Sequence, residues 1–563
     1  MRLINVLSFP LLFSSTVFGS ASAFNARADN STVQWGSCGG GHDSFQCANI
    51  SVPLDYHNAS DPRTINIYIT RLPATNTTNK LGSLFINPGG PGASGSDVVF
   101  EFGQNITTFL MGQYDIIGFD PRGVKRSEPY ISCFDNLLDE DLFSHMTRGL
   151  TLNIPSNITD EVVGDLDRQL TSIRGQVTSL SAQCYARVGD FMSFIGSEAV
   201  ARDIDTMSKA IDGPDVPINY YGLSYGSALG QRLVQILPPS RIGRVVIDAI
   251  VNPVLTSKYA FSPLNTSVST GDILQGFADN CASAGDACAL LNMTSTDIIS
   301  KINSTLDSLY YNPVHVTDLG YPAVADAGIL REVMFRALYS VQTWPMLAEV
   351  LAAAFAGNYT PAVSRVLPSL SATSAMQPDD SSYAGTLIVC NDALSTAQQT
   401  AADLMLSLRQ NSPQLGESAF SLGLCGDWPD VYPSHSRYNG TFGLPDHTLK
   451  TPILMMSNTY DPITPLVNAI NSLELYGNNA RLIQQADGYG HGAISAVSFC
   501  TLQLLQSYLL YGEVPETKHT ICQVDQKPFV PFSVSSATNS TQGYNLASRE
   551  AYTAMLMVLE TNL

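Results

Sequence analysis

A serine lies between two glycines at residues 222–226, where Ser224 follows an apolar stretch and precedes a helix-like one. This G-x-S-x-G pattern between a strand and a helix is typical of a nucleophile elbow, a sharp turn that exposes a reactive hydroxyl. The flanking glycines leave room where the strand and the helix pass each other. The sequence therefore predicts that Ser224 is a nucleophile.

A serine nucleophile needs a general base nearby and a carboxylate that orients that base. Asp461 and His491 each follow a predicted strand, where such sheets place functional groups, and they come after the serine in the order Ser, Asp, His. Asp487 is the nearest rival acid, but it lies only four residues before the histidine. Taken singly, Asp461 could form an ordinary turn before its proline, and His491 could be a surface residue. Together they predict a Ser224, Asp461, His491 triad.

Acyl transfer also needs hydrogen-bond donors for the oxyanion of the tetrahedral intermediate. The backbone N–H of Tyr225, directly after the nucleophile, is one candidate. The second is expected from the glycine-rich loop at residues 87–95, which follows an early strand. Pro91 has no N–H, so we predict Gly90 as the donor, with Gly89 as the alternative.

The same loop carries glycines 90, 92 and 95 in the G-x-G-x-x-G spacing of a dinucleotide-binding fingerprint. An acidic residue, Asp115, lies about twenty residues further on, as that fingerprint requires. However, Asp115 opens its predicted strand instead of closing it, and the chain has the features of an exported, disulfide-rich protein. We therefore expect no cofactor.

Ten cysteines fall into close pairs, and five local disulfides are their simplest interpretation. The pairs are Cys38 with Cys47, Cys133 with Cys184, Cys281 with Cys288, Cys390 with Cys425, and Cys500 with Cys522. No C-x-x-C pair occurs and no histidine completes a zinc pattern, so no metal is expected. The formal charge of −20 would repel a nucleic acid backbone, which argues against that class of partner.

Residues 1–23 have the pattern of a secretory signal peptide, with Arg2, an apolar region and the small residues 21–23. No later apolar stretch is long enough to span a bilayer, so no membrane anchor is expected. Twelve N-x-[ST] sequons suit a glycosylated, secreted protein. Their asparagines are Asn30, Asn49, Asn58, Asn76, Asn105, Asn157, Asn265, Asn292, Asn303, Asn358, Asn439 and Asn539.

Strand-like and helix-like segments alternate through the first half of the mature chain, which predicts an α/β fold with a mostly parallel sheet. Helical patterns at residues 297–309 and 328–356 then predict an inserted lid. We expect a first core part at 24–251, a helical lid at 252–450 and a second core part at 451–563. A second insertion is expected near residues 133–195. The expected strands are 64–71, 83–87, 114–120, 216–221, 244–248, 453–458 and 480–485, with a helix at 197–211.

Several motifs together resemble the secreted tripeptidyl aminopeptidase branch of the proline-iminopeptidase-like α/β hydrolases. These motifs are Asn-Pro-Gly-Gly-Pro-Gly at 87–92, Gly-Phe-Asp-Pro-Arg-Gly-Val at 118–124, residues 196–205, the elbow at 222–226, and Asp-Pro-Ile-Thr-Pro at 461–465. The similarity covers nearly all of the mature chain, including a C-terminal region like that of the branch. It implies an α/β-hydrolase fold and a serine exopeptidase that removes short peptides from free N-termini.

An exopeptidase of this kind needs carboxylates that bind the substrate α-ammonium, and Glu198 and Asp392 are the candidates. A helix cap or a surface carboxylate is the more common role for each. A carboxylesterase or lipase on the same fold is the main alternative. A non-catalytic binding protein is a further one, although such proteins usually lack a triad member, and here all three positions are filled. The sequence makes no prediction of the oligomeric state.

Overall fold

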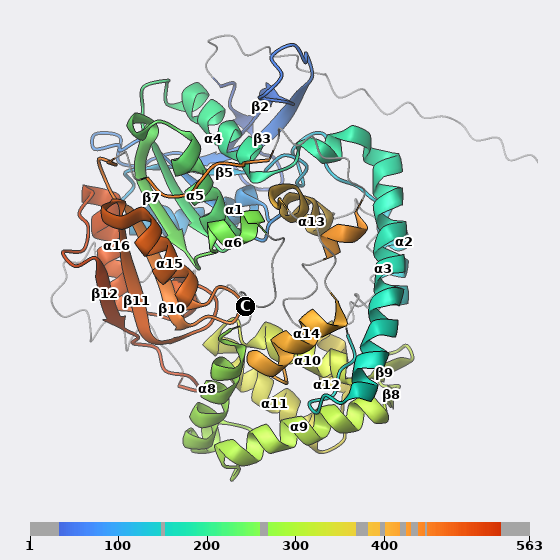
Figure 1. The fold of residues 1–563 in the computed structure, drawn as a ribbon. Helices are drawn as coiled ribbons and strands as arrows, with labels where there is room; N and C mark the ends of the chain where they lie inside the picture. Colours follow the sequence, from blue (N-terminus) through green and yellow to red (C-terminus); the bar gives the residue numbers. More distant parts are fainter. Residues whose placement is uncertain are drawn as a thin grey trace, which may run out of the picture.

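The computed structural model describes residues 33–147, 152–258, 268–366, 381–394, 400–416, 424–428, 437–444 and 448–530 (Figure 1). The predicted signal peptide lies outside these residues. A ten-stranded sheet has the order β1-β2-β3-β5-β4-β6-β7-β10-β11-β12. From β5 to β12 every neighbouring pair is parallel, whereas β1, β2 and β3 join in antiparallel register. This arrangement confirms the predicted α/β class with a mostly parallel sheet.

The central strands are largely buried because helices cover both faces of the sheet. The strands are β1 (Gly36–Ser37), β2 (Gln46–Pro53), β3 (Thr64–Leu72), β4 (Ser83–Asn87), β5 (Asp115–Phe119), β6 (Ile218–Leu223), β7 (Ile242–Asp248), β10 (Ile453–Tyr460), β11 (Ala480–Tyr489) and β12 (His519–Gln523). The sequence did not reveal β1, β2 or β12. The edge strand β12 is mostly exposed, so it lacks the apolar run that marks a buried strand.

Alternate residues of each central strand enter two different cores, as the strand period of two requires. Met455 faces the core that contains Leu229 of α5, whereas its neighbour Leu454 faces the core that contains Leu505 of α16. The helices that cover the sheet are α1 (Gly95–Phe109), α4 (Ser197–Ile211), α5 (Tyr225–Ile236), α15 (Leu466–Tyr476) and α16 (Phe499–Tyr511). The sheet is thereby fixed from both sides.

A helical cap lies between β7 and β10 in the sequence and has a core of its own around Phe277 and Trp344 (Figure 1). Its helices are α6 (Pro253–Lys258), α8 (Thr270–Ser283), α9 (Ser295–Tyr311), α10 (Ala327–Ala337), α11 (Trp344–Phe355), α12 (Thr360–Val366), α13 (Ser381–Asp392) and α14 (Ala401–Gln410), with a β8–β9 hairpin (Val314–Val316, Ala323–Ala325). The helical stretch expected at 328–356 is two helices, because a 3-10 turn at Val341–Thr343 interrupts it and Pro345 opens α11.

A second insertion connects the sheet to this cap. It contains α2 (Leu137–Thr147) and the 29-residue helix α3 (Asp160–Val188), which runs down one side of the molecule in Figure 1. The hydroxyl of Tyr310 in α9 donates a hydrogen bond of 3.0 Å to Asp165 of α3. The long helix therefore braces the cap from outside.

The five predicted disulfides are all present. Cys133–Cys184 ties the start of the second insertion to α3, and Cys390–Cys425 ties the end of α13 to a short 3-10 helix at Leu424–Asp427. None of the described helices is both long and apolar enough to cross a membrane. Nine of the twelve sequon asparagines lie in the described residues, and all nine are at least partly exposed.

Candidate active site

The predicted nucleophile occupies a strained turn between β6 and α5. Ser224 has a φ of 57° and a ψ of −121°, a region that non-glycine residues rarely adopt. A Cβ on Gly222 would lie 2.2 Å from the Gly226 carbonyl oxygen, and one on Gly226 would lie 2.6 Å from that of Asn87. Both positions therefore require glycine, which explains the motif in physical terms.

The structure brings the predicted acid and base together. His491 Nδ1 lies 3.1 Å from each carboxylate oxygen of Asp461, which is fully buried at the end of β10. The same carboxylate accepts backbone N–H bonds from Ile463, Thr464 and Gly492 at 3.0, 2.7 and 2.8 Å. With Nδ1 turned to Asp461, the Nε2 atom is the one left to act as a base.

The Asp461 carboxylate is held in its charged form. Burial is the largest influence and by itself raises the pKa of Asp461, but the charge of His491 and the hydrogen bonds from His491, Thr464 and Gly492 outweigh it. The pKa of Asp461 is consequently below its ordinary value. The Thr464 hydroxyl donates to Asp461 at 2.8 Å and lies 3.3 Å from His491 Nδ1. Thr464 was not among the residues predicted from the sequence, although it lies only three residues after the predicted acid.

Asp248, at the end of β7, connects the serine turn to the histidine loop. Its backbone oxygen accepts from Ser224 N at 2.9 Å, and its carboxylate accepts from Ala493 N at 2.8 Å and from Ile494 N at 3.3 Å. Among the described residues no hydrogen bond joins Ser224 to His491. Asp248 was also missed, and its only signal was an acidic residue at the carboxyl end of a parallel strand.

Burial raises the pKa of Asp248 to about 6. Hydrogen bonds from the backbone of Ala493 and Ala249 oppose this effect, the charge of Asp461 adds to it, and the charge of His491 opposes it. Asp248 therefore titrates in mildly acidic solution, in contact with the loop that carries the predicted base.

The glycine-rich loop passes directly over the serine turn. A Cβ on Gly89 would lie 2.9 Å from that of Ser224 and 3.1 Å from the Tyr225 nitrogen. The Gly89 N–H donates to Asn87 Oδ1 at 3.1 Å, whereas the Gly90 N–H has no partner among the described residues. Tyr225 opens α5, where N–H groups have no acceptor within the helix. This geometry favours Gly90 over Gly89 as the partner of Tyr225.

The two predicted amine-binding carboxylates each have partners in this structure. Glu198 is buried, with Oε1 at 3.1 Å from His57 Nε2 and 2.8 Å from Arg202 Nη2. Asp392 accepts from the backbone N–H of Ser197 at 2.8 Å and also from the Ser197 hydroxyl. The structure thus places both carboxylates beside the start of α4.

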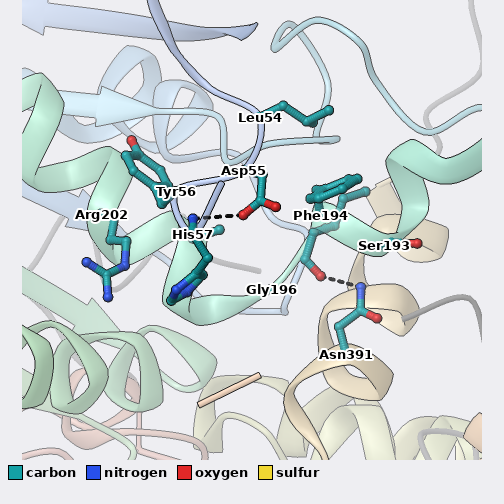
Figure 2. A pocket seen from close by; sticks show the side chains of 11 residues that line it. Leu54, Asp55, Tyr56, His57, Ser193, Phe194, Gly196, Arg202 and Asn391 are labelled. Atoms are coloured by element: carbon teal, nitrogen blue, oxygen red, sulfur yellow. Dashed lines mark hydrogen bonds between the residues drawn. The ribbon is translucent and has the colours of Figure 1, made fainter. Parts of the chain in front are cut away.

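A small pocket opens at this junction of α4 and α13 (Figure 2). Its lining residues are Leu54, Asp55, Tyr56, His57, Ser193, Phe194, Ile195, Gly196, Ala199, Arg202 and Asn391. His57 and Arg202, the two partners of Glu198, lie on one side of it, and Asn391 of α13 lies on another. None of the three predicted triad residues lines it.

The cap contacts the histidine loop directly. His491 donates its backbone N–H to the Tyr339 carbonyl oxygen at 2.8 Å, and the two rings meet edge to face with centroids 5.1 Å apart. Ser340 forms a β-bridge with Gly490. The cap therefore helps to fix the loop of the predicted base. Among the described residues no cluster of three or more potential metal ligands occurs.

Two protein families match parts of this chain. Residues 82–287 match the family described as alpha/beta hydrolase fold, and residues 412–522 match the family described as TAP-like protein. Among solved structures, a serine hydrolase from Cycloclasticus zankles covers 82% of this chain and 97% of its own, at 11% identity and a TM-score of 0.30. The sheet and the family match show the α/β-hydrolase fold.

Curated relatives make the class more specific. A tripeptidyl aminopeptidase from Streptomyces coelicolor is 26% identical over 86% of this chain and 85% of its own. Serine protease Hip1 from Mycobacterium tuberculosis is 25% identical, over 86% of this chain and 89% of its own. Carboxylesterase B from the same species is 28% identical, over 84% and 85% respectively. These matches confirm the predicted resemblance and the predicted class of serine hydrolase.

Proposed function

We propose that Ser224, His491 and Asp461 form the catalytic triad of a serine exopeptidase that releases short peptides from free N-termini. The observation that carries this proposal is the contact between the buried Asp461 and His491, whose loop is hydrogen-bonded to Asp248 beside the strained serine turn. In this mechanism His491 Nε2 takes the hydroxyl proton as Ser224 attacks the scissile carbonyl carbon.

The leaving amine then receives that proton, and a water molecule hydrolyses the acyl-enzyme by the same route. The backbone N–H groups of Gly90 and Tyr225 stabilise the oxyanion of each tetrahedral intermediate. Hydrogen bonds between a catalytic base and its nucleophile are often long in unliganded structures and shorten when substrate binds. The missing Ser224–His491 bond is compatible with that behaviour. No step requires a cofactor.

Peptide substrates are supported by the relatives whose names contain tripeptidyl aminopeptidase and serine protease. Tripeptides are the expected product, since the first of these names specifies that length. Binding of the substrate α-ammonium by Glu198 or Asp392 stays a prediction.

Carboxylesterase activity is the second candidate, and the relative named carboxylesterase B is the observation that favours it. Both reactions use the same acyl-enzyme chemistry, so the choice depends on what binds under the cap. Secretion and N-glycosylation are proposed with either activity. The signal-like residues 1–23, the five disulfides and the exposed sequons support them.

The test compares tripeptide anilides that have a free or an acetylated N-terminus, alongside simple aryl esters. We expect efficient cleavage of the free-amine anilide, little cleavage of the acetylated one, and no activity in Ser224→Ala. Ester hydrolysis that depends on Ser224, without cleavage of any peptide, would move the assignment to a carboxylesterase. Failure of a fluorophosphonate to label Ser224 would contradict both enzymes and favour a binding protein.

A further inference from the structure

Cap helix α13 packs against the loop that carries one proposed oxyanion donor. A Cβ on Gly385 of this helix would lie 2.3 Å from the Pro91 carbonyl oxygen and 3.8 Å from the Gly92 nitrogen. No side chain fits at that contact, so the helix backbone rests directly on the residue after Gly90. The position of α13 therefore limits where the Gly90 N–H can point.

The carboxyl end of the same helix reaches the second proposed donor through a chain of polar groups. Asp392 accepts from the backbone N–H of Ser197 at 2.8 Å and from the Ser197 hydroxyl. The Ser197 hydroxyl oxygen lies 2.6 Å from the Tyr225 hydroxyl oxygen. Both Ser197 and Tyr225 are buried. The residue after the nucleophile is thus attached to the cap by its side chain.

The direction of these hydrogen bonds follows from the charges. Burial, reinforced by the charge of Asp392, raises the pKa of Tyr225 far above its ordinary value, so its hydroxyl stays protonated. Tyr225 can then donate to Ser197, which in turn donates to the Asp392 carboxylate. Every donor in the chain has an acceptor, and breaking one link would leave a buried polar group unpaired.

The end of α13 is itself fixed in place. Asn391 donates its side-chain amide to the backbone oxygens of Met192, at 2.9 Å, and Ile195. The neighbouring Cys390 forms the disulfide with Cys425. Because three successive residues are anchored, Asp392 presents its carboxylate from a rigid support.

We propose that α13 aligns the two halves of the oxyanion hole. Gly385 fixes the position of the loop that carries Gly90, and Asp392 fixes the position of Tyr225 through Ser197. Gly385, Ser197 and Asp392 are positioning residues, because each acts through another group. This inference rests on the proposed function, and it gives Asp392 a task other than binding the substrate amine.

The test measures kcat and KM for a free-amine tripeptide anilide, and the inhibition constant of the matching peptide aldehyde. The aldehyde forms a hemiacetal with Ser224 whose oxygen occupies the oxyanion hole. For Ser197→Ala, Tyr225→Phe, Asp392→Ala and Gly385→Ala we expect kcat to fall by about 10-fold to 100-fold. Binding of the aldehyde should weaken by a similar factor, because the aldehyde mimics the transition state. KM should stay nearly constant.

Two variants act as matched controls. Gly175→Ala places a methyl group on helix α3 with no atom within 4 Å, and Asp286→Ala removes an exposed carboxylate. Both should keep the wild-type kcat and aldehyde affinity. Thermal unfolding checks the fold of each protein. If Gly385→Ala or Asp392→Ala does not fold, Tyr225→Phe decides, since it removes only one hydroxyl group.

Unchanged aldehyde affinity in Ser197→Ala and Tyr225→Phe would overturn the inference, and it would leave the proposed function intact as long as Ser224→Ala is inactive. A higher KM in Asp392→Ala, confined to free-amine substrates, would also overturn it by making Asp392 an amine-binding residue. The double variant of Ser197→Ala and Tyr225→Phe should lose no more activity than the worse single variant, because both remove the same link.

Discussion

The reactive character of the proposed site comes from a few side chains whose surroundings are fixed by backbone hydrogen bonds. His491 and the backbone N–H groups of Thr464 and Gly492 keep the pKa of Asp461 low despite complete burial. Asp248 is equally buried, and among the described residues no cationic side chain forms an ion pair with its carboxylate, so burial raises its pKa to about 6. Two carboxylates at neighbouring strand ends therefore have different charge states in mildly acidic solution.

Replacing Asp461 by asparagine should lower kcat by about 10⁴-fold, because an amide no longer holds the imidazole in the tautomer that the reaction needs. Steady-state kinetics with the free-amine tripeptide anilide measures this loss. Asp487→Asn is the matched control, since this exposed residue was the rival acid in the sequence. Equal losses in the two variants would contradict the assignment of Asp461.

Asp248→Asn should change how stability depends on pH. The pKa of Asp248 is raised on folding, so the folded protein binds this proton more tightly, and its stability decreases as pH rises from about 4 through about 6. The asparagine variant lacks this dependence. When pH falls from 7 to 4, the free energy of unfolding of the wild type should therefore rise, relative to that of the variant, by on the order of 1 kcal/mol or more. Denaturant unfolding at both pH values measures the difference, and a constant difference would contradict it.

The strands and helices of the fold place these residues, and the sequence predicts some of these elements and residues but not others. Buried strands such as β4 and the helix α4 were predicted at their observed bounds, because apolar runs and helical periodicity are local signals. Ser224, Asp461 and His491 could be nominated because each follows such a strand. Asp248 and the contacts of α13 could not, since their roles come from hydrogen bonds between segments far apart in the chain.

Gly89→Ala should abolish labelling of Ser224 by a fluorophosphonate. Gly89 has a φ of +100°, and a Cβ there would lie 2.4 Å from the Leu223 carbonyl oxygen, within the serine turn. Gly213→Ala is the control, because Gly213 has a φ of +105° but open space around the added methyl group. The Gly213→Ala variant should lose only about 1 kcal/mol of stability, from backbone strain at a positive φ. Normal labelling of Gly89→Ala would show that the loop does not constrain the nucleophile.

In the whole molecule, the cap and the sheet together form the proposed catalytic apparatus. The cap contacts the loops of the proposed site at two places. Helix α13 contacts the oxyanion loop, and Tyr339 contacts the histidine loop. The long helix α3 braces the cap from outside, and disulfides fix α3 and α13 at their ends. We therefore expect a cap attached in this way to position groups beneath it as well as to select substrates.

Tyr339→Ala should lower kcat/KM by about 10-fold for peptides and for small aryl esters alike, because the lost ring contacts His491 and not a particular substrate. Tyr339→Phe keeps the ring and should retain wild-type activity with both substrate types. Parallel kinetics with an anilide and an ester separate the two effects. A loss restricted to peptides would mean that Tyr339 contacts substrate and does not position the base.

The most direct measurement uses one unmodified decapeptide with a free or an acetylated N-terminus, and follows its products by mass spectrometry. The wild-type protein should release successive tripeptides from the free-amine form and spare the acetylated form, and the Ser224→Ala variant should cleave neither form. Equal cleavage of the two forms, internal cuts, or products that persist in Ser224→Ala would contradict a Ser224-dependent exopeptidase.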